Sequence, residues 1–225
     1  MFAAEAEWLA AQLRELPGDS LSPMLNVGSS TAEFRQRTQP WIEQTLLAPL
    51  VARGIEIVHL DFRAGNGIDL CADLLRDTDF AKVGERQYGS LLCCNILEHV
   101  LDAGEFARRC VSLVRPGGTI AVTVPRSYPR HGDPIDTMLR PAPAEVARLF
   151  PGTGVLADAV LDVGESYLDD VRRRPLILLR HLARLPVPFL GWEKWQASMT
   201  KPYWLLHNYR VTAVLLRRQP KPAAT

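Results

Sequence analysis

Residues 91–125 read LLCCNILEHVLDAGEFARRCVSLVRPGGTIAVTVP and predict one βαβ unit. An apolar run ends in polar residues, a helical pattern follows, and a second apolar run begins after a Pro-Gly-Gly turn. Strands separated by a helix of this length are typical of parallel pairing through a right-handed crossover. We therefore expect Asn95, Glu98 and His99 to lie where the first of these two strands ends.

The alternation of strand and helix patterns extends over most of the chain. Strand patterns occur at 25–28, 55–61, 89–95, 118–124, 157–164 and 209–218, with a short apolar piece before Asp73, and helical patterns at 39–52, 102–115 and 144–150. They predict an α/β fold with a doubly wound, mostly parallel seven-stranded sheet, helices on both faces and an antiparallel last strand. We expect a single domain over residues 1–225, with a helical insertion at about 168–207.

The composition is that of an ordinary globular protein, with 47% hydrophobic and 23% charged residues. The formal net charge of +1 provides no overall field that would attract nucleic acid. Glu5 and Glu7 stand where a secretory signal would carry positive charge, and no apolar run is long enough to span a membrane. The four cysteines form no C-x-x-C pair, so we expect reduced, buried thiols in a cytoplasmic protein and no metal site.

Polar residues follow the predicted parallel strands, at the edge where open α/β sheets bind ligands. These tips are Gly28-Ser29-Ser30, Asp61, Asp73, Asn95 to His99 and Arg126 to Asp136. An acid such as Asp61 can accept two hydrogen bonds from the vicinal hydroxyls of a ribose, although it could also be a solvated turn acid. Gly28 permits close approach of the backbone to a ligand, and an ordinary turn with a serine helix cap is the alternative.

The turn after the first strand reads GSSTAE at residues 28–33 and departs from the G-x-G-x-x-G pattern. It lacks the second and third glycines that allow a pyrophosphate to approach a helix N-terminus. A nicotinamide-dependent enzyme is therefore disfavoured, and a ligand with adenosine but no pyrophosphate fits better.

Four stretches of the chain resemble the Rossmann-like (class I) S-adenosylmethionine-dependent methyltransferases of the family often called type 11. These stretches are LNVGSS, IVHLDFRAGNGIDLCADL, LLCCNILEHVLDAGEFARRCVSLVRPGG and TIAVTVP. The resemblance covers roughly residues 22–150 and the last pair of strands. It implies a methyltransferase with S-adenosyl-L-methionine as its cofactor.

The resemblance also implies which residues hold the cofactor. Gly28, Ser29 and Ser30 would lie beside its methionine part, Asp61 at the ribose, Asp73 and Leu74 around the adenine, and Asn95, Leu97 and Glu98 near the sulfonium. Phe62 is a further expected cofactor contact. The first motif has fewer glycines than the family pattern, and Asn26 stands where the family often has an acid. A catalytically silent protein that serves as a binding or scaffold partner is therefore the alternative function.

Methyl transfer to an oxygen acceptor requires removal of a proton, and histidine titrates in the neutral range. We predict that His131, in the loop after the fifth strand, is the base, with Asp133 or Asp136 able to orient its ring. His99 is a second catalytic candidate. An ordinary surface loop for His131 and a helix-capping role for His99 are the alternatives.

The insertion at 168–207 carries an amphipathic pattern followed by aromatic residues. Ile177, Leu178, Leu182 and Leu185 can share one helix face, Arg180 and Arg184 lie on the other, and Trp192, Trp195, Tyr203 and Trp204 follow among Lys194 and Lys201. Two interpretations remain open: a lid that touches a membrane surface, or a helical cap that packs over the sheet. The expected acceptor is an oxygen or nitrogen atom of a small molecule, a glycan or a lipid-linked compound. Nucleic acid is not expected because no motif for a flipped base is present.

Overall fold

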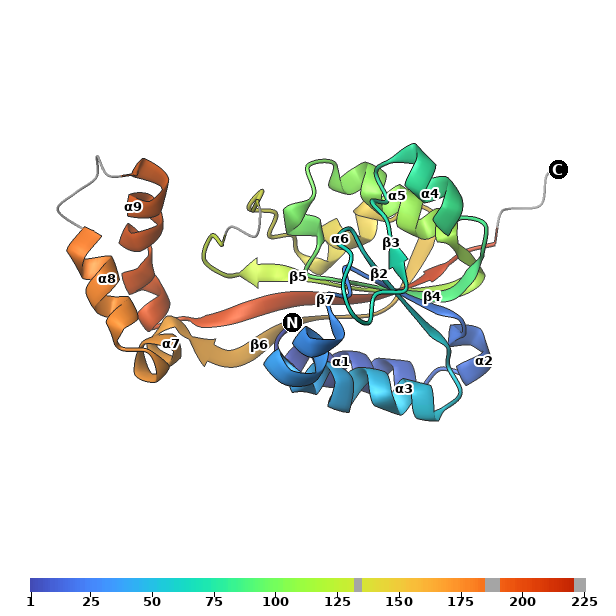
Figure 1. Ribbon diagram of the computed structural model, residues 1–225, viewed down its shortest axis with the longest axis horizontal. Coiled ribbons are helices and arrows are strands. Elements are labelled where there is room, and N and C mark those ends of the chain that lie inside the picture. Colours follow the sequence, from blue (N-terminus) through green and yellow to red (C-terminus); the bar gives the residue numbers. More distant parts are fainter. Residues whose placement is uncertain (132–134, 185–190, 221–225) are drawn as a thin grey trace.

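The computed structural model, described here over residues 1–131, 135–184 and 191–220, contains a seven-stranded sheet (Figure 1). Its strands are β1 (Met24–Val27), β2 (Ile57–Asp61), β3 (Leu70–Cys71), β4 (Tyr88–Cys94), β5 (Val114–Ser127), β6 (Thr153–Ser166) and β7 (Asn208–Arg218). The strand order is β3-β2-β1-β4-β5-β7-β6. Strand β7 is antiparallel to both of its neighbours, and the other pairings are parallel. This arrangement confirms the predicted fold class.

Helices cover both faces of the sheet (Figure 1). One layer holds α1 (Ala3–Arg14), α2 (Gly18–Leu21), the π-helical turns η1 (Phe34–Thr38) and η2 (Ile42–Leu47), and α3 (Ala48–Ala52). The other layer holds α4 (Asp77–Val83), α5 (Ala103–Leu113) and α6 (Pro143–Leu149). The predicted helix at 39–52 is therefore present, but residues 42–47 within it have π-helical hydrogen bonding.

The core consists of two apolar clusters, one on each side of the sheet, and β4 belongs to both. Leu91 and Cys93 pack with α5 and α6, whereas Leu92 packs with α1 and α3. Because successive side chains of a strand point to opposite faces, a strand covered on both faces needs an uninterrupted apolar run. This explains why LLCC has no polar residue and why the first polar side chain of this segment is Asn95.

The Pro-Gly-Gly segment allows β5 to pass close to β4. Helix α5 ends at Leu113 and β5 begins at Val114, so the strand starts earlier than the sequence pattern indicates. Gly117 has a φ of +80° and open space around its Cα, whereas a Cβ on Gly118 would lie 2.5 Å from the carbonyl oxygen of Gly89. The first glycine is required by backbone conformation and the second by the contact between strands.

The insertion forms helices between β6 and β7: α7 (Tyr167–Arg173), α8 (Leu176–Arg184), α9 (Trp192–Met199) and the 3-10 turn η5 (Lys201–Leu205). Figure 1 shows α8 and α9 projecting beyond the end of the sheet, on the side where β5 and β6 finish. The interpretation that these helices pack over the sheet is therefore wrong. Leu185 and the side chains of Arg184 and Lys194 lie outside the part of the chain that the structure describes.

Within the described ranges, no helix has both the length and the apolar character that crossing a membrane requires. The four cysteines are free thiols. Cys93 and Cys110 are buried as expected, but Cys71 is exposed, because the two-residue strand β3 lies at the edge of the sheet.

We predict that Gly118→Ala destabilises the protein more than Gly117→Ala. A methyl group at residue 117 costs about 1–2 kcal/mol, because only the left-handed backbone disfavours it. A methyl group at residue 118 must displace backbone as well, so the midpoint of thermal unfolding should fall further. Gly104→Ala in α5, where no atom lies closer than 3.5 Å to the added Cβ, is the control. Equal midpoints for the residue 117 and 118 variants would contradict the role given to the strand contact.

Candidate functional site

A cavity of about 690 Å³ lies at the carboxyl ends of the parallel strands. It is located between the tips of β1, β2 and β4, where the strand order reverses, which is the position at which open α/β sheets bind ligands. The predicted site residues that line it are Gly28, Ser29, Ser30, Asp61, Phe62, Asn95, Glu98, His99 and His131. The structure therefore brings together residues from four strand ends that the sequence places up to about a hundred positions apart.

Other predicted site residues lie elsewhere. Leu74 and Leu97 are 2% and 0% exposed and belong to the apolar core. Asp73 is exposed, and its carboxylate accepts the backbone N–H of Leu75 at 2.9 Å, so it forms a local turn instead of facing the cavity. Asp133 lies outside the described residues.

The turn after β1 is held by a buried arginine that the sequence analysis did not identify. Arg35 is 3% exposed and donates to the carbonyl oxygens of Ser29, Ser30 and Gly67. Gly28 has a φ of +63°, and a Cβ there would lie 2.7 Å from the side chain of Ile96. With these carbonyls bound to Arg35, the turn has one fixed shape at the cavity wall.

Asp61 lies beside this turn and is 9% exposed. Its Oδ2 accepts the backbone N–H of Ser30 at 2.9 Å, and its Oδ1 accepts that of Arg63 at 3.1 Å. Each carboxylate oxygen can accept more than one hydrogen bond. Asp61 is therefore fixed in position and retains capacity to accept hydrogen bonds from a ligand in the cavity.

The tip of β4 is fixed by the N-terminal helix. Asn95 has a φ of +53°, and its side-chain amide donates to Oε2 of Glu5 at 2.8 Å. Glu5 is 0% exposed, and Met1 and Phe2 line the cavity. In the sequence, Glu5 indicates only the absence of a secretory signal, because nothing local predicts a contact with a residue 90 positions away.

Glu98 is fully buried beside the cavity, with an exposed fraction of 0%. Among the described residues, neither of its carboxylate oxygens has a hydrogen-bond partner. The nearest basic group is His99, whose Nε2 lies 3.7 Å from Oε1. Burial raises the pKa of Glu98 to about 7, although the charge of Arg140 opposes the shift.

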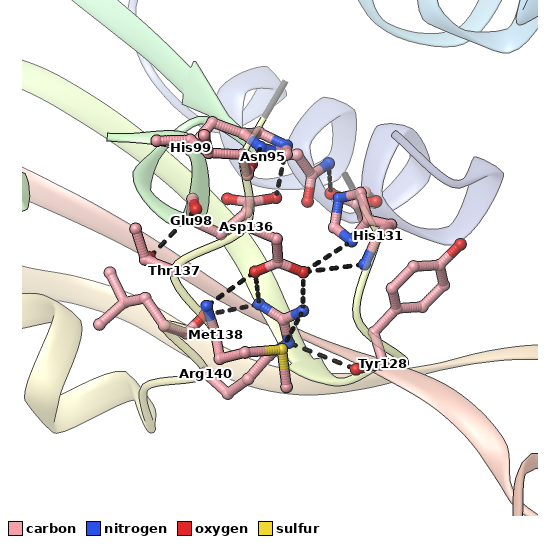
Figure 2. A network of polar contacts seen from close by, with 12 residues as sticks. Asn95, Glu98, His99, Tyr128, His131, Asp136, Thr137, Met138 and Arg140 are labelled. Carbon is pink, nitrogen blue, oxygen red and sulfur yellow. Dashed lines mark hydrogen bonds and ion pairs between the residues drawn. The ribbon is translucent and has the colours of Figure 1, made fainter. Parts of the chain in front are cut away.

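The loop after β5 brings His131 to the same wall (Figure 2). It is attached to the tip of β4 by Thr137, whose backbone N–H and hydroxyl both donate to the carbonyl oxygen of Glu98. His131 Nδ1 lies 3.1 Å from Asp136 Oδ2, at an ion-pair distance but without hydrogen-bond geometry. Asp136 is thus the carboxylate behind the ring, one of the two acids that the sequence analysis considered.

Asp136 is the charged centre of this loop. Arg140 donates to both of its carboxylate oxygens, at 3.1 and 2.7 Å, and the backbone N–H groups of His131 and Met138 donate at 3.0 and 2.8 Å. Burial works against a charge on Asp136, but these hydrogen bonds outweigh it and lower the pKa to about 2. The pKa of His131 is lowered, chiefly by burial, so its imidazole is predominantly neutral at neutral pH.

In sequence, no protein-family model and no curated protein matches the chain. In structure, it resembles a proposed sarcosine dimethylglycine methyltransferase from Galdieria sulphuraria, with 14% identity, coverage of 96% of this chain and 85% of that chain, and a TM-score of 0.52. It also resembles the cyclopropane synthase MmaA2 from Mycobacterium tuberculosis (13% identity, 95% and 83% covered, TM-score 0.52). The cyclase SpnF is similar to it as well (15% identity, 95% and 80% covered, TM-score 0.51). The chain has the class I methyltransferase fold.

Within this methyltransferase fold, the two sides of the cavity differ in chemistry. The β1 and β2 side offers a small serine turn, a fixed carboxylate at Asp61 and the exposed ring of Phe62. The β4 and β5 side offers Glu98, His99 and His131, which are groups that can exchange protons. The first side is suited to holding a polar ligand, and the second to acting on a group brought close to it.

Proposed function

We propose that the chain is an S-adenosylmethionine-dependent methyltransferase. The observation that carries this proposal is the position of Asp61 and the Gly28–Ser30 turn on one wall of a cavity at the switch point of a class I methyltransferase fold. A fixed carboxylate there can accept hydrogen bonds from both ribose hydroxyls of an adenosine. The turn has small side chains, which leave room for the methionine part.

The remaining contacts in this proposal follow from the lining of the cavity. Phe62, which is 58% exposed, would provide an apolar surface for the adenosine, and Asn95 and Glu98 would face the sulfonium end. Asp73, Leu74 and Leu97 do not line the cavity, so their contribution would be limited to supporting the loops that do.

The reaction in this proposal is an in-line displacement. S-adenosylmethionine, held by Asp61 and the Gly28–Ser30 turn, would supply a methyl group activated by its sulfonium; a lone pair of the acceptor would displace the sulfur, which would leave as a neutral thioether. An oxygen acceptor also loses a proton, which His131 would take, with Asp136 holding its ring and His99 beside it at 5.0 Å between ring centres. The acceptor is a small molecule, a glycan or a lipid-linked compound, and the chain would act as a single domain.

The proposal predicts that the wild-type protein binds S-adenosylhomocysteine and that Asp61→Ala lowers the affinity at least about tenfold, because two charge-assisted hydrogen bonds are lost. Calorimetric titration measures this directly. Asp73→Ala is a matched control, since Asp73 is an acid of the same region that does not face the cavity. Circular dichroism of each variant would show that the fold is retained.

Two results would contradict the assignment. Absence of binding by wild-type protein at millimolar ligand would reject the cofactor site, and the catalytically silent scaffold would become the leading function. An equal loss of affinity in Asp61→Ala and Asp73→Ala would show that the effect is not specific to the cavity.

The catalytically silent scaffold has independent support from the glycine-poor first turn. One structural neighbour is named as a cyclase, so the fold by itself does not identify the reaction.

For catalysis, His131→Ala should reduce methyl transfer by about a hundredfold or more while leaving the affinity for S-adenosylhomocysteine unchanged, since removal of a general base affects the chemical step. Transfer would be measured with methyl-tritiated S-adenosylmethionine and an acceptor found by screening small molecules, glycans and lipids. His207→Ala is the control, since His207 is an exposed histidine that does not line the cavity. Full turnover by His131→Ala would reject a catalytic role for this residue.

We also propose that the projecting helices contact a membrane surface. Leu176, Leu179, Leu182 and Trp192 are between 50% and 75% exposed there. Arg174 and Arg180 are also exposed there, whereas Arg172 and Arg173 of α7 pair with Asp169 and Glu165. Exposed apolar groups next to basic groups are typical of peripheral binding to anionic lipid. The apolar face differs from the one predicted, because Ile177 and Leu178 are half-buried and Leu176 and Leu179 point outward.

Flotation with vesicles that contain anionic lipid tests this contact. Wild-type protein should float, and the double variant Leu176→Ser with Leu179→Ser should float less, because apolar area is removed from the contact. Leu101→Ser is the control, since Leu101 is 86% exposed but belongs to the loop after β4. Failure of wild-type protein to float, or an equal effect of the control, would reject the membrane contact.

A further inference from the structure

Three potential metal ligands meet at the cavity wall. One nitrogen of each ring of His99 and His131 and one carboxylate oxygen of Glu98 all lie within 4.8 Å of one another. Figure 2 shows the three side chains together, with the Asp136–Arg140 pair next to them. They come from two segments, the tip of β4 and the loop after β5, which Thr137 ties together through the carbonyl of Glu98.

The environment of Glu98 is unusual for a structural residue. A fully buried carboxylate normally has partners, because an unpartnered buried polar group is costly. Both oxygens of Glu98 lack a hydrogen-bond partner among the described residues, and Arg140 is bound to Asp136 instead. The side chain nevertheless lines the cavity. A positively charged ligand at this position would satisfy it.

Each of the two histidine rings has a nitrogen that can donate a lone pair to a metal ion. His99 Nδ1 lies 2.5 Å from the carbonyl oxygen of Ile135. Because a carbonyl only accepts, Nδ1 carries the proton and Nε2, which is the nitrogen near Glu98, carries the lone pair. His131 has the Asp136 carboxylate 3.1 Å from its Nδ1. For His99, this hydrogen bond to a carbonyl is the arrangement that orients metal-binding histidines, whereas the Asp136 carboxylate lies beside the His131 ring without a hydrogen bond to it.

From this geometry we propose that Glu98, His99 and His131 form a binding site for one divalent transition-metal ion, with Zn²⁺ the best fit. Two histidines and a glutamate are a ligand set that Zn²⁺ uses in catalytic sites, where a further position stays open for water or substrate. The open position would face the cavity. An ion there could bind the acceptor oxygen and make its proton easier to lose.

The spacing fits an ion after a small adjustment. Bonds of about 2.0–2.2 Å place tetrahedral ligands about 3.4 Å apart, so side chains that now span up to 4.8 Å must each move by about 1 Å or less. His131 lies in the loop after β5, and His99 is the last residue of the short 3-10 turn η3 (Leu97–His99). Neither ring is within a long helix or a central strand that would resist such a shift.

The ion site changes the role of His131. A lone pair bound to a metal cannot take a proton, so His131 acts as a ligand when the ion is present. The sequence predicts no metal site because its four cysteines form no C-x-x-C pair, and the three ligands proposed here include no cysteine. Metal binding can be measured without cofactor or acceptor, so this inference stands or fails independently of the proposed methyl transfer.

The test is a titration of untagged, metal-free protein with Zn²⁺, followed by Co²⁺ as a spectroscopic probe. One equivalent should bind, and Glu98→Gln and His131→Ala should each lower the affinity at least about tenfold, because each removes one ligand. His207→Ala should bind as the wild type does. Cys71→Ser is a second control, since Cys71 is an exposed free thiol that could bind zinc outside the site. Bound Co²⁺ should show no thiolate charge-transfer band.

The outcomes are distinct. Stoichiometric binding that depends on Glu98 and His131 supports the site, and a rise in unfolding temperature with Zn²⁺ in wild type but not in Glu98→Gln strengthens it. Absence of stoichiometric binding, binding unaffected by Glu98→Gln, or binding abolished by Cys71→Ser would overturn the inference. Glu98→Gln keeps the side-chain volume and removes a buried acid, so it should fold and keep the test informative. Titration with S-adenosylhomocysteine, in the absence of metal, reports separately on the cofactor site.

Discussion

Strand β4 has apolar helices on both of its faces, and this constraint places the polar groups of the site at its end. Tyr88 to Cys93 are buried, so no charged side chain can be accommodated before Asn95. The chain then turns at Asn95 through a left-handed conformation and immediately provides Glu98 and His99. Because β1 and β2 run parallel to β4 and end at the same edge, Gly28 and Asp61 meet these groups across one cavity.

Buried carboxylates near this cavity are satisfied in different ways. Glu5 is bound to Asn95 and to the backbone of its own helix, and Asp136 is bound to Arg140 and two backbone amides. Both are acids that serve the structure. Glu98 has no such partners among the described residues, and its raised pKa of about 7 expresses the cost of charging it there. The contrast separates a carboxylate used for support from one available to a ligand.

The fold does not determine the reaction, which depends on the residues that line the cavity. Structural neighbours with 13–15% identity include a proposed methyltransferase, a cyclopropane synthase and a cyclase. Proteins with this fold are therefore named for different reactions. In this chain, Asp61 and the serine turn carry the argument for the cofactor. Glu98, His99 and His131 carry the argument for chemistry at the acceptor side. The projecting helices α7 to α9 contribute no described residue to the cavity lining, although Trp204 of η5 contacts Tyr209, which packs on Tyr128 at the cavity.

The sequence by itself determined the order of strands and helices, the parallel sheet and the polar tips, because these depend on periodicity over a few neighbouring residues. It also placed Asp61, Asn95 and His131 at strand ends that meet. Only the tertiary structure showed that Asp73 turns away, that Arg35 and Glu5 hold the turns, and that Glu98 is buried without a partner. Those facts depend on which distant segments pack together and on how many hydrogen bonds remain unmade after packing, and no local pattern encodes either.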